Sequence, residues 1–119
     1  MNERNSRHSF DPAAFEQLLG SEDPALLAPL FERALSSLSE FAGNRSIQMS
    51  SLEFDAHKLK NTTLQLGLEQ LTHILEAIET AAKNNREERC QALMRIFNSE
   101  YDLVSECLEQ YAEQLRSKL

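Results

Sequence analysis

His57 is the residue of this sequence whose type and position could best do chemistry. A neutral imidazole nitrogen is a competent nucleophile near pH 7. Apolar or small residues recur around it at steps of four, three, four and three, and they are Leu52, Ala56, Leu59, Thr63 and Leu66. At about 100° per residue in a helix, His57 lies roughly 150° from the centre of that stripe. We therefore expect its side chain to point away from the core.

The residues around His57 indicate a docking surface. Lys60 lies one helical turn after it, Asn61 and Leu64 continue the same outward strip, and Phe54 lies one turn before it. A solvated helix face would normally carry Glu and Lys at such positions. An apolar rim around a polar centre is typical of a surface that binds another protein.

Other kinds of chemistry find little support. Cys90 and Cys107 are too few for a disulfide framework, and we expect free thiols. His73 lies sixteen residues from His57 without a ligand-spaced partner, so we expect no metal site. We find no nucleophile elbow or catalytic triad pattern, and no loops that would form a substrate pocket. An enzyme is therefore the least favoured interpretation.

The composition predicts that the helix with His57 belongs to a single all-α domain. The chain has 119 residues, 41% of them hydrophobic, with three Gly, three Pro and no Trp. A net charge of −7 without a basic stripe disfavours nucleic acid and anionic membrane surfaces as partners. The sequence contains neither an apolar run long enough to cross a membrane nor the pattern of a secretory signal, so we expect a cytoplasmic protein.

The helix signals divide the chain into a tail and a bundle. Residues 1–9 show no periodicity and are expected to be a flexible tail. Asp-Pro pairs predict two helix starts, and the expected helices run from Pro12 to about Gly20, Pro24 to Gly43, Ser50 to Leu66, Leu68 to Lys83, and Glu87 almost to the end. The second helix carries an apolar stripe of Leu27, Leu30, Phe31, Ala34, Leu35, Leu38 and Phe41. Ser50 and Ser51 are the expected cap of the third. Residues 10–119 should thus form an antiparallel four-helix bundle with a short additional N-terminal helix.

The segment around His57 resembles the signature of histidine-containing phosphotransfer (HPt) domains. That signature is Ala-His-x-Leu-Lys-Gly, two small residues, a short gap and Gly, and here the segment from Ala56 to Leu68 reads AHKLKNTTLQLGL. The next helix of the family has the form Leu-x-x-Leu-x-x-x-Leu-Glu, and its places are taken in register by Leu71, Ile74, Ile78 and Glu79.

The resemblance implies a phosphorelay intermediate of two-component signalling. His57 would accept a phosphoryl group, through Nε2, from an aspartyl phosphate on a response-regulator receiver domain and pass it to another receiver. Lys60 matches the lysine that faces the phosphoryl group, and Glu79 matches a position whose side chain can take the Nδ1 proton of the histidine. The domain would be a carrier rather than an enzyme. It would need no cofactor of its own, since Mg²⁺ belongs to the receiver.

One departure from the family signature bears on the partners. The family usually has Gly where this sequence has Asn61. The extra side chain could hinder docking, slow transfer or select receivers, or it could donate a hydrogen bond to the phosphoryl group.

The resemblance also implies the partners. These are receiver domains and a hybrid histidine kinase, which we expect a monomer to contact through a surface built from the first three helices. The expected rim consists of Phe15, Leu18, Phe54, Lys58, Asn61 and Leu64. Two alternatives remain open: a degenerate HPt fold that binds a receiver or kinase without carrying phosphate, and a plain helical scaffold or dimerisation module.

Overall fold

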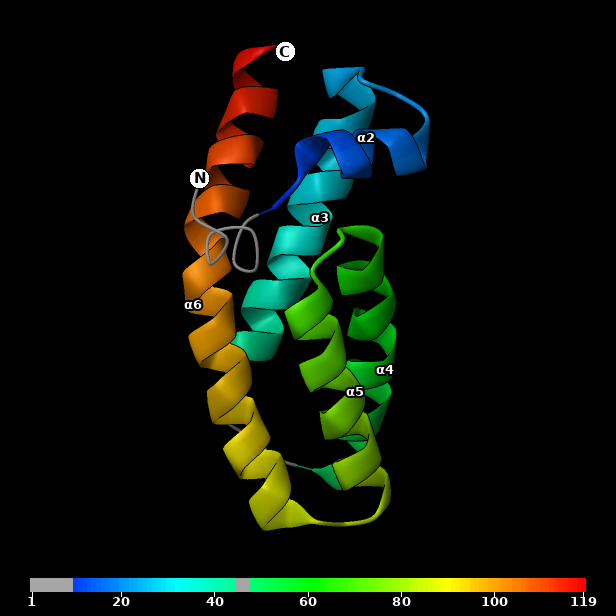
Figure 1. Cartoon of the computed structure of the whole chain (residues 1–119), viewed down its shortest axis with the longest axis vertical. Coiled ribbons are helices and arrows are strands. Elements are labelled where there is room, and N and C mark those ends of the chain that lie inside the picture. The colour runs from blue at the N-terminus through cyan, green and yellow to red at the C-terminus, as the bar shows by residue number, and fades with distance from the viewer. Residues whose placement is uncertain (1–9, 45–47) are drawn as a thin grey trace.

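The computed structural model describes residues 10–44 and 48–119, which form helices joined by short connections (Figure 1). Its helices are α2 (Pro12–Leu19), α3 (Pro24–Ala42), α4 (Met49–Gln65), α5 (Glu69–Lys83) and α6 (Glu87–Ser117). These bounds confirm the predicted helices to within one or two residues, and the all-α class with them. The expected tail over residues 1–9 and part of the expected linker, residues 45–47, lie outside the described residues. Among the described helices, none is both long and apolar enough to cross a membrane.

The helix starts follow the capping signals at two positions and depart from them at a third. The carboxylate of Asp11 accepts a hydrogen bond from the backbone N–H of Ala13, and that of Asp23 accepts one from Ala25, both at 3.1 Å. The predicted cap at Ser50 and Ser51 is wrong, because Gln48 is the N-cap and makes no side-chain capping bond. Both serines already lie within the first helical turn, and the hydroxyl of Ser51 donates to Oε1 of Gln48 at 3.3 Å instead.

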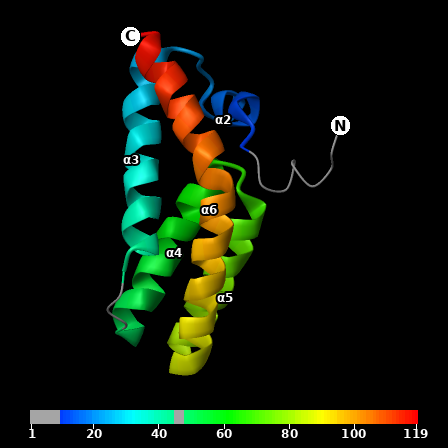
Figure 2. The ribbon, with the colours of Figure 1, turned by 90° about the vertical axis from the view of Figure 1, so that its left-hand side faces the viewer.

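The helices are arranged around α6, which runs the full length of the molecule (Figure 1). One part of α6 packs against α5 and another against α3, while α4 and α5 form the most extensively packed pair. Helices α3 and α4 touch only lightly. In the view turned by 90°, α2 lies across the end of the bundle to which α3 and the C-terminal half of α6 extend (Figure 2). Gly67 lets the chain reverse between α4 and α5, since its φ of 73° is one that L side chains rarely adopt.

One continuous core joins the helices. Phe31, Leu38, Leu75, Ile78, Phe97 and Leu108 are among its fully buried side chains. Leu30 does not belong to it, because 44% of this residue is exposed, and the prediction that placed Leu30 on the core stripe is wrong. At 100° per residue Leu30 lies on the edge of the stripe that Leu27, Phe31 and Leu38 occupy.

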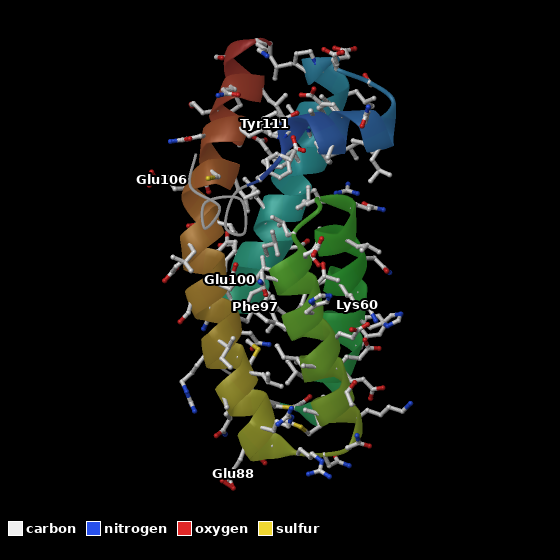
Figure 3. All side chains as sticks on the ribbon, viewed as in Figure 1. Lys60, Glu88, Phe97, Glu100, Glu106 and Tyr111 are labelled. Atoms are coloured by element: carbon white, nitrogen blue, oxygen red, sulfur yellow. The ribbon has the colours of Figure 1, made fainter. Side chains whose placement is uncertain are left out.

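An aromatic cluster fixes the short helix α2 to the bundle. Phe15 of α2 lies among Phe10, Phe31 of α3 and Tyr111 of α6, with ring centroids 4.9 to 6.2 Å apart. The hydroxyl of Tyr111 (labelled in Figure 3) also donates to Oε2 of Glu16 at 2.8 Å. Burial, with the neighbouring carboxylate, raises the pKa of Tyr111 far above its ordinary value.

Candidate functional site

His57 projects from α4 into solvent, as its place in the sequence predicts. Its side chain is 59% exposed. The opposite face of α4 buries Leu52, Ala56, Leu59 and Thr63, which confirms the core stripe predicted for this helix. The burial of that stripe fixes the rotation of α4 and thereby determines which way the imidazole faces.

A carboxylate from the neighbouring helix holds one nitrogen of His57. The Nδ1 atom lies 2.7 Å from Oε2 of Glu79, which α5 supplies. The other oxygen of the same carboxylate, Oε1, accepts a hydrogen bond of 3.0 Å from Nζ of Lys60. The three residues to which the sequence assigned chemistry therefore meet at the junction of α4 and α5. Lys60 is labelled in Figure 3, where it lies at the edge of the bundle formed by these two helices.

The charge of Glu79 decides where the histidine proton lies. Burial raises the pKa of Glu79, but the hydrogen bonds from Lys60 and His57 and the Coulomb attraction of both residues outweigh it. The net effect is a pKa below the ordinary value of 4.5, so Glu79 is a carboxylate at neutral pH. An ionised carboxylate can only accept hydrogen bonds, so Nδ1 must be the donor. In the neutral imidazole, Nε2 then keeps its lone pair and faces away from Glu79.

A pair of threonines connects the same two helices near the site. Oγ1 of Thr63 on α4 lies 2.8 Å from Oγ1 of Thr72 on α5. Each hydroxyl also lies within hydrogen-bond distance of a backbone carbonyl of its own segment, of Lys60 and of Leu68 respectively. Thr63 is fully buried and Thr72 half-buried, so this polar contact has little competition from water. Thr63 was predicted only as a core position, and no spacing in the sequence reveals that Thr72 is its partner.

The residues expected to form the rim are exposed, except one. Phe54 and Leu64 are each 66% exposed, Leu18 is 59% exposed, and Lys58 and Asn61 are also exposed. Their side chains are free to contact a partner.

Phe15 is the exception, because only 4% of it is exposed and it lies within the aromatic cluster. Its expected place on the rim is therefore wrong. Leu26 and Leu30 of α3 are large apolar side chains exposed to solvent, and neither was predicted to lie on the rim.

One of three comparisons with known proteins finds a match. The chain matches the model of the Hpt domain family over residues 13–118. No curated protein and no solved structure matches it. Among the described residues, no three side chains of His, Cys, Asp or Glu are grouped so as to hold a metal ion. The family match spans nearly the whole chain, all five described helices and the segment that carries His57, and on this evidence the chain belongs to the Hpt domain family.

Proposed function

We propose that this protein is a phosphorelay intermediate that carries a phosphoryl group on Nε2 of His57. The observation that supports this most directly is the bond of 2.7 Å between Nδ1 and the Glu79 carboxylate. It leaves the opposite ring nitrogen uncovered on a side chain that is 59% exposed. Hpt domains are phosphocarrier modules that act with receiver domains and kinases, and the proposal assigns that role to these residues.

For the transfer, this protein mainly has to supply Nε2 of His57 as a nucleophile with a free lone pair. The lone pair of Nε2 attacks the phosphorus of a receiver's aspartyl phosphate, an N–P bond forms, and the O–P bond to the aspartate breaks. The aspartate leaves as a carboxylate, and the imidazole keeps its proton on Nδ1. Phosphorylation gives the ring a positive charge, which the carboxylate of Glu79 stabilises. The magnesium ion and most groups that stabilise the transition state belong to the receiver.

Lys60 serves this step in two ways in our proposal. Its ammonium group has three protons, of which one is donated to Oε1 of Glu79 at 3.0 Å. That bond holds the carboxylate in place against His57. The remaining protons are available to oxygens of the incoming phosphoryl group, one helical turn from its attachment point.

The receiver would dock on the exposed strip around His57. Phe54 and Leu64 supply apolar contacts, and Lys58 and Asn61 supply polar ones. The contact with a receiver must form and break in each transfer, so we expect its area to be modest. We expect the protein to act as a monomer.

A phosphotransfer assay tests the proposal. The purified protein is mixed with phosphorylated receiver domains encoded in the same genome, and acid-labile, base-stable label is followed on wild type, on His57→Gln and on His73→Gln. His73 is the matched control, since it is also an exposed histidine, on α5. We expect label on wild type and on His73→Gln and none on His57→Gln.

Asn61 supports a second candidate function, a protein that binds a receiver or kinase without carrying phosphate. Its exposed side chain stands one turn after His57, where the family signature has Gly. Receiver binding by wild type without any label on His57 would favour this alternative. Label gained by Asn61→Gly alone would then identify the side chain as the obstacle.

A further inference from the structure

A hollow of about 300 Å³ lies between α3 and α4, outside the group formed by His57, Lys60 and Glu79. It exists because these two helices touch only lightly. Phe41 and Leu59, both buried residues, form its apolar base. Glu40, Asp55 and Lys58 are exposed residues that also line it.

The described side chains that line the hollow carry two carboxylates, of Glu40 and Asp55, and one ammonium group, of Lys58. Within the described part of the chain, neither Glu40 nor Asp55 has an ion pair, and Lys58 pairs with neither of them. The hollow also adjoins the C-terminal end of α3, where the helix dipole places partial negative charge and where the last turn contains no basic residue. An apolar base beneath two carboxylates that have no ion-pair partner among the described residues suits a side chain with a long alkyl stem and a cationic end. Arginine and lysine have this form.

The hollow adjoins the strip that carries the histidine. Lys58 directly follows His57 in the sequence and lines the hollow, as does Thr62. Around the axis of α4, at about 100° per residue, His57, Asn61, Lys58 and Thr62 follow one another in steps of about 40°, 60° and 40°. A protein that docks over His57 and extends across Asn61 and Lys58 therefore reaches the hollow.

We propose that this hollow receives an arginine or lysine side chain of the receiver domain that docks over His57. The inference rests on the proposed function and adds a determinant of partner choice to it. Glu40 and Asp55 outnumber Lys58, the one cation among the described residues that line the hollow, so the charge of this lining is negative. A negatively charged hollow favours a partner that presents a cation at the matching position and disfavours one that presents an anion there.

The test compares two double variants that change the net charge equally. Glu40→Gln with Asp55→Asn removes the carboxylates of the hollow. Glu88→Gln with Glu106→Gln removes two exposed carboxylates of α6, which Figure 3 shows away from α3 and α4. Binding to each receiver domain encoded in the same genome is measured at low and at high salt, and circular dichroism checks the fold. Because all four residues are exposed, both variants should fold as wild type does.

The binding constants decide the inference. We expect the hollow variant to bind its preferred receivers about tenfold more weakly at low salt, with a smaller loss at high salt, and the α6 variant to bind as wild type does. Wild-type affinity of the hollow variant for every receiver, with His57 still labelled, would overturn the inference and leave the proposed function standing. A wild-type protein that neither takes label nor binds any receiver would overturn both.

Discussion

Replacing Glu79 by alanine should change the tautomer of His57 and slow phosphoryl transfer. The carboxylate now holds the proton on Nδ1 through a contact of 2.7 Å, and this is the form in which Nε2 is the nucleophile. Without the acceptor, the proton is free to occupy Nε2 and block the atom that must attack.

The size of the effect follows from the geometry. A hydrogen bond to an ionised group contributes about 1.5–3 kcal/mol. Because the side chain of His57 is 59% exposed, the lower value applies here. About 1.5 kcal/mol corresponds to roughly a tenfold change in the ratio of the two tautomers. Since only the Nδ1–H form is reactive, the rate of transfer from a receiver follows the population of that form. It should therefore fall by about two- to tenfold, with about twofold expected for a wild type that is mostly Nδ1–H.

Nitrogen-15 NMR of the histidine ring reports the tautomer, and rapid-quench measurements on the same samples report the transfer rate. Glu76→Ala is the matched control, because Glu76 is an exposed glutamate one turn earlier on α5. Glu79→Gln should be intermediate, since its amide oxygen can still accept from Nδ1. An unchanged tautomer in Glu79→Ala would refute the assigned role of the carboxylate. A changed tautomer with an unchanged rate would refute its connection to transfer.

Other substitutions probe the surroundings of the site and the fold. Lys60→Met, which keeps an unbranched chain and removes the amine, should reduce the transfer rate about tenfold while NMR shows the Nδ1–H tautomer retained. Because the pKa of Glu79 is lowered in the folded state, its contribution to stability is present above pH 4.5 and is lost as the pH falls through the lower folded value. Urea unfolding should thus show a weaker loss of stability below pH 4.5 for Glu79→Gln than for wild type. Tyr111→Phe removes the 2.8 Å bond to Glu16 and should cost about 1–2 kcal/mol in the same assay at neutral pH. The raised pKa of Tyr111 adds an alkaline effect, a loss of stability as the pH rises above 10, which should be smaller in the variant. Leu38→Ala, in the fully buried core, should cost about 2–5 kcal/mol of unfolding free energy and leave transfer by the folded protein unchanged.

The helices and the outward position of His57 were predictable because both depend on local sequence. Apolar spacing fixes the buried face of α4, and Asp-Pro pairs fix the starts of α2 and α3. The start of α4 was less predictable, since serine near a helix start does not specify which residue has the non-helical backbone of a cap.

Contacts between helices were predictable only where the family signature supplied them. The signature led to Glu79 as the partner of His57, and their distance of 2.7 Å agrees with it. Periodicity alone does not give the register between α4 and α5, which is why Thr72 was missed. The prediction that Phe15 lies on the rim depends only on its place in the first short helix, which was expected to contact a partner. Three aromatic rings enclose Phe15, and two of them, those of Phe31 and Tyr111, come from other helices, so single-helix patterns do not reveal such a cluster.

The uneven packing of the bundle separates the chemistry from the choice of partner. His57 and Glu79 stand on α4 and α5, the pair of helices held together most extensively, whereas α3 touches α4 only lightly. Residues exposed on α2 and α3 can therefore drift in evolution without disturbing the distance on which the nucleophile depends. A chimaera that exchanges residues 12–42 with those of another Hpt domain should change its preference among receivers, through the part of the docking surface on α2 and α3, while it keeps its own histidine chemistry.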